Sequence, residues 1–362
     1  MSIGFFKHPF FSSRAVYRIL AFVFFSGLVL GWYGRLSYFH FFLKSKRLDQ
    51  RACQVQPVRQ PGYTYINPLL LCEVAGTPAF ASYRTYQSAI EKYIDAHVHS
   101  NTLIAASVYF RDFRAGQWVS IHENEHYAPA SLLKVPIMIA TLKYAESHPD
   151  FLAKRLYHGS ILNPYVPHFL PSHPLELYRW YSIDELLHAM IAYSDNEALV
   201  MVYNAMDPEY LGEIYTDLGL TPPPDPGLPG KIDFINTKTY AYFFRILYNS
   251  TYLSRVMSEK TINLLLESDF SDGILPGIPS DVKIAHKFGE RVTLTTSPPV
   301  TELHECGIVY MPDHPYLLCV MTKGWDFDSL TGVLRDISVM TYAEMFKKYG
   351  TSMNAPQKAT LP

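Results

Sequence analysis

The order of strand-like and helix-like segments is the feature that most constrains the fold of this chain. Five apolar runs are typical of strands, and they lie at 103–110, 118–121, 284–292, 303–311 and 315–322. The first two flank a turn sequence at Asp112–Gly116, and a block of helical pattern separates them from the other three. The economical assembly is a single sheet built from both groups. We therefore predict an α+β fold, with an antiparallel five-stranded sheet flanked by helices and accompanied by a helical subdomain.

Helical periodicity marks the segments around and between these strands. Apolar residues recur at helical spacing over 86–94, before the first strand, and again over 330–340, after the last. Ser182 and Glu185 have the spacing of a capping box, which predicts that a helix begins there and ends near Ser194. These patterns place helices at both ends of the body as well as in its middle.

An uncharged apolar run from Ile19 to Gly34 lies close to the start of the chain, and a second apolar patch follows at 37–43. If Arg35 extends its charge toward the interface, this stretch is long enough to span a bilayer. A cleaved signal peptide is the alternative, but no Ala-x-Ala-like pattern of small residues follows the run. Positive charges lie on both sides, so they do not decide the orientation.

The four cysteines bear on the orientation. Cys53 and Cys72 lie just after the membrane run, and Cys306 and Cys319 lie at equal distances from a turn, which would place them opposite each other on two antiparallel strands. Two disulfides would indicate an oxidising compartment, whereas four buried free thiols are the alternative. We predict a single-pass protein of the cell membrane. Its parts are a cytoplasmic N-terminus (1–18), a transmembrane anchor (19–43), an extracytoplasmic linker (44–79), an extracytoplasmic main domain (80–350) and a C-terminal tail (351–362).

The charge balance argues against one class of partner. The chain has 31 Lys and Arg against 33 Asp and Glu, a formal net charge of -2. Such a chain has no basic field that would bind a nucleic-acid backbone. We predict no nucleic-acid partner, no cofactor and no metal.

Ser131 and Lys134 introduce an apolar run, 132–142, that is typical of a helix. Residues three apart lie on one helical face, so we expect the Lys134 amine beside the Ser131 hydroxyl. A serine needs a neighbouring base to act as a nucleophile, and a lysine is such a base only if burial and nearby positive charge lower its pKa. Pro136 requires this helix to bend or to begin late. Taken alone, the pair also fits a capping serine and a solvated lysine.

A second short motif, Ser194-Asp195-Asn196, follows the capped helix. Ser194 is suited to relay a proton toward a leaving nitrogen, and the Asn196 amide is suited to hold a substrate amide. Asp195 is expected to bond to nearby backbone. Taken alone, this cluster of short polar residues fits an ordinary turn equally well.

The third motif, Lys287-Phe288-Gly289, lies in the predicted strand 284–292. Lys287 is expected to meet a substrate carboxylate, and Gly289 would allow a ligand to approach the backbone closely. The backbone N–H groups of Ser131 and Glu290 are the expected donors to an oxyanion. The alternative is an edge-strand lysine followed by a bulge glycine.

Together these motifs resemble those of the class A β-lactamase and penicillin-binding protein superfamily, over about residues 80 to 350. The matching residues are Ser131, Lys134, Ser194, Asn196, Lys287 and Gly289. The resemblance implies a serine hydrolase that forms an acyl-enzyme at Ser131 with a β-lactam or a D-alanyl stem peptide of peptidoglycan. Two alternatives remain open: a D,D-carboxypeptidase or transpeptidase, and a non-catalytic peptidoglycan-binding module that retains the fold.

The sequence departs from the family pattern at two places. Phe288 stands where the family usually has Thr or Ser, so a hydroxyl that helps to bind the substrate carboxylate is lost. Class A β-lactamases carry, between the second and third motifs, a loop Glu that activates the deacylating water. The corresponding stretch here, Thr221–Ile235, contains no Glu and offers only Asp225 and Asp233. Because general-base help is typically worth about 10²- to 10⁴-fold, we predict slow deacylation.

Overall fold

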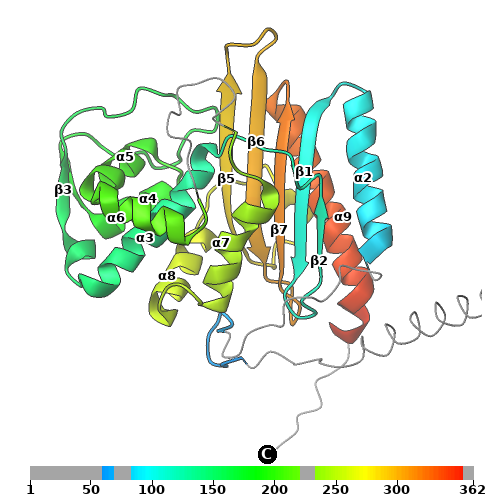
Figure 1. Ribbon diagram of the computed structural model, residues 1–362, viewed down its shortest axis with the longest axis horizontal. Coiled ribbons are helices and arrows are strands. Elements are labelled where there is room, and N and C mark those ends of the chain that lie inside the picture. Colours follow the sequence, from blue (N-terminus) through cyan, green and yellow to red (C-terminus); the bar gives the residue numbers. More distant parts are fainter. Residues whose placement is uncertain (1–58, 69–82, 221–232, 354–362) are drawn as a thin grey trace, which may run out of the picture. The chain divides into compact units, whose positions relative to one another are not determined.

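The computed structural model describes residues 59–68, 83–220 and 233–353. Its strands are β1 (Leu103–Asp112), β2 (Trp118–Ile121), β3 (Arg155–His158), β4 (Arg179–Ser182), β5 (Ile284–Thr293), β6 (Val300–Val309) and β7 (Tyr316–Gly324). Five of them form one antiparallel sheet in the order β2-β1-β7-β6-β5 (Figure 1). The last strand, β7, pairs with the first, β1, so the predicted sheet built from both ends of the body is confirmed.

Helices cover both faces of this sheet. They are α2 (Arg84–His99), α3 (Lys134–Ser147), α4 (Ile183–Ala192), α5 (Asn196–Ala205), α6 (Pro208–Asp217), α7 (Thr237–Asn249), α8 (Arg255–Leu266) and α9 (Phe327–Met353), with 3₁₀ turns at Ala130–Leu133, Phe151–Ala153 and Leu275–Gly277. Helices α2 and α9, the first and last of the described residues, pack together against one face (Figure 1). Helix α7 packs on β1 and β7 from the other side, and the remaining helices gather beyond β5 as the helical subdomain. This double cover explains why β6 and β7 are buried along almost their whole length.

Two hydrophobic cores result from this arrangement. One lies between the sheet and α2 and α9, around Ile90, Phe110 and Leu334. The other joins the sheet to the helical subdomain, around Met138, Leu187 and other side chains of α3, α4, α7 and α8. Ser131, the nucleophile candidate, lies in the 3₁₀ turn Ala130–Leu133, which precedes α3 and contacts β5.

Local signals in the sequence are reproduced closely at the start of α4. Ser182 accepts a hydrogen bond from the backbone N–H of Glu185 at 3.1 Å, and the Glu185 carboxylate accepts one from the Ser182 N–H at 2.7 Å. The predicted capping box is therefore confirmed. The small two-stranded sheet β3–β4 was not expected, because its four-residue strands have no clear alternation.

The predicted register of the last hairpin is also confirmed. Cys306 lies directly opposite Cys319 on β6 and β7, and the two form a disulfide. The other predicted pair, Cys53 and Cys72, lies outside the described residues, as does the predicted anchor 19–43. Within the described ranges, no helix combines the length and the apolar character that crossing a membrane requires.

Candidate active site

Ser131 is presented by a tight turn rather than by a regular α-helix. It belongs to the 3₁₀ turn Ala130–Leu133, and α3 begins only at Lys134. Pro136 therefore falls in the first helical turn, where its missing N–H removes no bond, so the expectation of a late start is confirmed. Ala130 has a positive φ of 46°, a strained conformation of the kind that accumulates at functional sites.

The Lys134 amine lies beside the Ser131 hydroxyl, at a distance of 3.1 Å between Nζ and Oγ. The 3₁₀ geometry explains this, because side chains at positions i and i+3 eclipse each other. The same Nζ lies 3.1 Å from the Ser194 hydroxyl, 2.6 Å from the Ser194 carbonyl and 2.8 Å from the Asn196 side-chain oxygen. The structure thus brings the first two motifs together around one buried amine.

The electrostatics of Lys134 are those required of a base. Its side chain is fully buried, and this desolvation is the main reason that its pKa lies well below the usual lysine value. The positive charge of Lys287 lowers the pKa further, whereas Asp195 and Glu290 oppose the shift. Both causes that the sequence suggested, burial and Lys287, therefore act on Lys134.

Ser194 and Asn196 are placed by the junction between α4 and α5. Asp195 caps α5 by accepting a hydrogen bond from the Ala198 N–H at 2.7 Å, and its other oxygen accepts one from the Leu175 N–H at 3.1 Å. Its predicted role in binding backbone is confirmed. Ser194 has a positive φ of 54°. This conformation turns both its carbonyl and its hydroxyl toward Lys134.

The third motif lies on the edge strand β5. Lys287 is fully buried; its Nζ donates to the Phe288 carbonyl at 3.2 Å and lies 4.3 Å from the centre of the Phe288 ring. Burial lowers the pKa of Lys287 to about 7, against the opposing charges of Asp269, Glu305 and Glu290. The Phe288 ring stacks on another aromatic ring, and the core on the α2 and α9 side contains both. The charge of Lys287 acts on Lys134 although, among the described residues, no hydrogen bond joins the two side chains.

The absence of a side chain at Gly289 is required by the packing of the chain itself. A side-chain Cβ at this position would lie 2.9 Å from the Leu132 nitrogen and 3.1 Å from the Pro129 oxygen. The turn around Ser131 thus leaves no room for a side chain at position 289, and the predicted close approach of a ligand to this strand stays a prediction. The absence of a Cβ lets β5 lie directly against the turn that carries the nucleophile candidate.

A polar network that the sequence analysis missed holds the segment leading into Ser131. One Glu302 oxygen accepts hydrogen bonds from the Ala128 N–H at 3.0 Å and from His304 Nε2 at 3.2 Å, and His304 Nε2 also lies 3.0 Å from the Ala128 carbonyl. Lys323 pairs with both Glu302 and Asp233. The available signal was the occurrence of several polar and charged residues, Glu302 and His304 among them, in a predicted strand whose other residues are mostly apolar.

The comparisons with known proteins agree with this geometry. The family model described as "Beta-lactamase enzyme family" matches residues 89–345, which is most of the chain. The chain belongs to this family. It is accordingly a serine hydrolase of the β-lactamase type, and the predicted resemblance is confirmed.

Solved structures with the same fold include three informative examples. A mutant of PBP-A, described as an acyl-enzyme complex with penicillin G, has a TM-score of 0.61 and 20% sequence identity, covering 73% of this chain and 97% of that one. A class A β-lactamase from Mycobacterium abscessus has a TM-score of 0.60 and 16% identity, covering 71% and 99%. A variant of the class A β-lactamase of the last common ancestor of Gram-negative bacteria has a TM-score of 0.60 and 19% identity, covering 72% and 99%. At these identities the likeness establishes the fold. No curated protein matches the chain.

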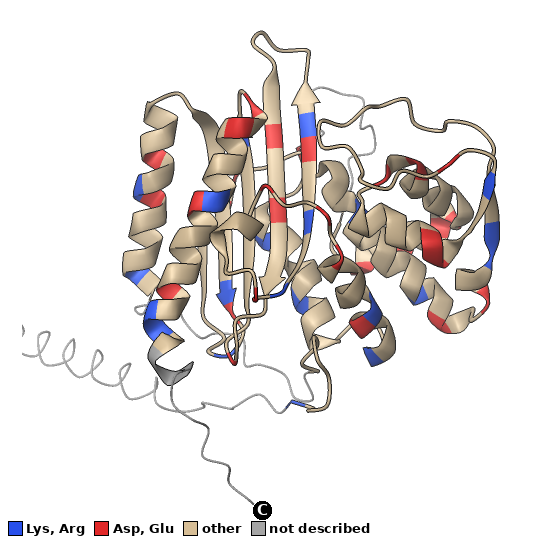
Figure 2. Ribbon diagram, turned by 180° about the vertical axis from the view of Figure 1, so that it is seen from behind, with Lys and Arg blue, Asp and Glu red and all other residues tan. Residues whose placement is uncertain are grey.

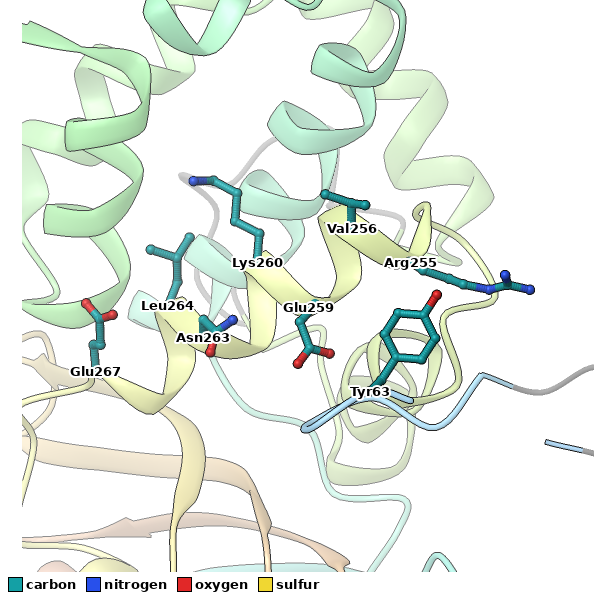
Figure 3. A pocket seen from close by; sticks show the side chains of 8 residues that line it. All are labelled: Tyr63, Arg255, Val256, Glu259, Lys260, Asn263, Leu264 and Glu267. Carbon is teal, nitrogen blue, oxygen red and sulfur yellow. The ribbon is translucent and has the colours of Figure 1, made fainter. Parts of the chain in front are cut away.

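A surface pocket lies away from this site, along α8 (Figure 3). It is lined by Tyr63, Arg255, Val256, Glu259, Lys260, Asn263, Leu264 and Glu267. None of the residues around Ser131 contributes to it. In the part of the chain that the structure describes, no group of three or more His, Cys, Asp or Glu side chains is arranged to hold a metal ion.

Proposed function

We propose that this β-lactamase-family protein forms an acyl-enzyme at Ser131 with a β-lactam or a D-alanyl peptide of peptidoglycan and releases the acyl group slowly. One observation carries the proposal: a fully buried lysine amine lies 3.1 Å from the hydroxyl of Ser131. A penicillin G acyl-enzyme has been described for a mutant of PBP-A, which shares the fold. The retained combination of Ser131, Lys134 and Ser194 argues against a module that only binds peptidoglycan.

In the first step, neutral Lys134 accepts the Ser131 hydroxyl proton as the oxygen attacks the substrate carbonyl. A bond forms between Ser131 Oγ and the carbonyl carbon, and the carbonyl π-electrons move onto the carbonyl oxygen. The backbone N–H groups of Ser131 and Glu290 are the expected hydrogen-bond donors to this oxyanion. Ser194 Oγ, 3.1 Å from the Lys134 amine, then passes a proton to the leaving nitrogen as the C–N bond breaks. Lys134 replaces the proton on Ser194, so the lysine is neutral again when the acyl-enzyme is complete.

The second half of the reaction has less support in this chain. Thr221–Ile235 contains no Glu, and of its two carboxylates only Asp233 lies within the described residues. Asp233 is paired with Lys323, which lowers its availability as a base for a deacylating water. Since such a base is worth about 10²- to 10⁴-fold, a long-lived acyl-enzyme follows. This favours the alternative of a D,D-carboxypeptidase or transpeptidase over an efficient β-lactamase.

We also propose that the protein is anchored in the cell membrane by residues 19–43, with residues 80–350 on the extracytoplasmic side. The apolar run Ile19–Gly34 supports an anchor. The Cys306–Cys319 disulfide supports an oxidising compartment, where a peptidoglycan substrate would also be found. Protease protection of a tagged chain in intact cells would test this, because an intracellular domain would remain uncleaved.

Labelling with a fluorescent penicillin tests the proposed reaction. Wild type and Ser131→Ala would be incubated with the probe and then chased with unlabelled penicillin. We expect label that persists on wild type and is absent from the variant. Rapid loss of label, together with penicillin hydrolysis at a kcat above roughly 10 s⁻¹, would indicate an ordinary β-lactamase. Equal labelling of the two proteins, or no labelling of either by a penicillin or a D-alanyl-D-alanine peptide, would contradict the proposal.

A further inference from the structure

Two buried side chains of β6 hold Ala128, which lies three residues before Ser131. The Ala128 N–H donates to a carboxylate oxygen of Glu302 at 3.0 Å, and the Ala128 carbonyl lies 3.0 Å from Nε2 of His304. Glu302 and His304 are two positions apart, so both project from the same face of the strand. Figure 2 shows acidic bands on β6, although this strand lies inside the sheet. A buried carboxylate needs hydrogen-bond partners, and Ala128 supplies one of them.

Hydrogen bonds on both sides fix the orientation of the His304 ring. The backbone N–H of Thr322 donates to His304 Nδ1 at 3.2 Å. Because a backbone N–H is only a donor, Nδ1 is the acceptor, and the neutral ring carries its proton on Nε2. This N–H is shared between the Ala128 carbonyl, at 3.0 Å, and the Glu302 carboxylate, at 3.2 Å. The imidazole therefore donates to Ala128 from a fixed position.

The Glu302 carboxylate is held through its other oxygen as well. Lys323 Nζ lies 3.5 Å from that oxygen and donates to the His126 carbonyl at 3.2 Å. Burial raises the pKa of Glu302, but the hydrogen bonds from His304 and Ala128 and the charge of Lys323 together hold this pKa below its usual value. The acceptor for the Ala128 N–H is thus an ionised carboxylate, which makes a stronger hydrogen bond than a neutral group.

The residues on either side of Ala128 are held by backbone hydrogen bonds. Tyr127 pairs with Ile235 through two such bonds, of 2.8 and 3.2 Å. Pro129 has no N–H, and its carbonyl accepts a hydrogen bond from the Leu132 N–H at 2.9 Å. Ala128 differs from both neighbours because its two backbone groups bond to side chains. Substitutions on β6 can therefore release Ala128 while its neighbours stay paired.

The strained residue Ala130 makes this support important for the reaction. It lies between Ala128 and Ser131, and its φ is 46°. Such a conformation persists only where the surrounding structure fixes it. If Ala128 were released, Ala130 could relax, and the 3.1 Å distance between Ser131 Oγ and Lys134 Nζ would no longer be maintained.

We propose that Glu302 and His304 are positioning residues for acylation: by holding both backbone groups of Ala128, they keep the turn in the conformation that places the Ser131 hydroxyl beside Lys134. They act through Ala128 and not by contact with the substrate. This inference rests on the acylation of Ser131 proposed above, and it assigns part of the reaction geometry to a network outside the three motifs.

Substitutions of Glu302 test the inference. Glu302→Met removes the acceptor for the Ala128 N–H and keeps a side chain of similar length, whereas Glu302→Gln keeps an uncharged acceptor oxygen. Asp207→Ala is the control, because it destabilises the protein by removing the cap of α6, where Asp207 accepts from the Glu209 N–H at 2.8 Å. The full-length proteins would be reacted with penicillin G over a range of concentrations, at a temperature at which circular dichroism shows each variant to be folded. The Ser131 adduct would be followed by intact mass and located by peptide mapping.

We expect Glu302→Met to be acylated at least about tenfold more slowly than wild type at saturating penicillin, because a 1 Å misplacement of reacting groups costs on the order of 10²-fold in rate. Its half-saturating concentration should stay within about threefold of wild type, since the substitution leaves the binding surface in place. Glu302→Gln should stay within about threefold of wild type in both quantities. A merely structural role would leave the rate of the folded Glu302→Met variant unchanged, as we expect for Asp207→Ala.

A rate for Glu302→Met within about threefold of wild type, or a Glu302→Gln variant as slow as Glu302→Met, would overturn the inference and leave the proposed function intact. If Glu302→Met does not fold, the same comparison is made with His304→Phe, which keeps a ring but removes the donor to the Ala128 carbonyl, and with His304→Gln, which keeps a donor. Absence of any Ser131 adduct in wild type would overturn both the inference and the proposed function.

Discussion

Replacing Gly289 with alanine tests the contact between β5 and the turn that carries Ser131. The new Cβ would lie 2.9 Å from the Leu132 nitrogen and 3.1 Å from the Pro129 oxygen, whereas ordinary contacts begin at 3.4 Å. These two neighbours are backbone atoms; a third, Leu132 Cγ at 3.0 Å, belongs to a side chain, and its movement would not relieve the two backbone contacts. Strand and turn therefore have to separate by about 0.5 Å, the shortfall at the closer atom.

The expected magnitude follows from this displacement. Inserting a methyl group into a packed contact typically costs about 1–3 kcal/mol of unfolding free energy. A 1 Å misplacement of reacting groups costs on the order of 10²-fold in rate, so 0.5 Å corresponds to about tenfold slower acylation of Ser131. Stability would be measured by denaturant unfolding, and acylation by the mass of the penicillin adduct.

Gly212→Ala is the matched control. Gly212 lies inside α6, and a Cβ there meets nothing within 4 Å. Because alanine is the better helix former, this change should stabilise the protein by up to about 1 kcal/mol and leave acylation unaltered. The reasoning would be refuted if Gly289→Ala unfolded at the wild-type denaturant concentration and acylated within twofold of the wild-type rate.

Three further predictions follow from the buried groups of the sheet and the site. Lys134→Met keeps the apolar length but removes the base, so acylation of Ser131 should fall by about 10²- to 10⁴-fold; a rate within threefold of wild type would exclude Lys134 as the base. Burial lowers the pKa of Lys287 from 10.5 to about 7 in the folded protein. Below pH 7 the side chain is charged in both states, and burying the charge lowers the free energy of unfolding by the full amount; this loss disappears as the pH rises toward 10.5. The stability of wild type relative to Lys287→Met should therefore rise between pH 7 and 10.5, by on the order of 5 kcal/mol, and parallel stability curves would disprove the shift. Replacing both Cys306 and Cys319 by alanine removes the disulfide between residues 13 positions apart and should lower the free energy of unfolding by about 3 kcal/mol, measured by urea unfolding. Reductant should destabilise wild type but not the double variant.

The sequence by itself determined the features that depend on neighbours within a few positions. Ser131 and Lys134 are brought together by the geometry of a single turn, and the Ser182 and Glu185 cap is complete within four residues. The disulfide partners Cys306 and Cys319 are fixed by the register of one hairpin. Such contacts can be predicted from the sequence because backbone geometry alone sets the distance between the residues.

Only the tertiary structure decided which distant groups surround the nucleophile candidate. The amine of Lys134 meets Ser194 across 60 positions, and Phe169 donates to Glu290 across 121. Gly289 lies against the turn of Ser131 only because β5 is the edge strand of the sheet, next to the helical subdomain. Periodicity records which face of an element is buried, but not which element covers it. The hydrogen bond from Phe169 to the buried carboxylate of Glu290 is therefore a property of the folded chain, and no local sequence pattern predicts it.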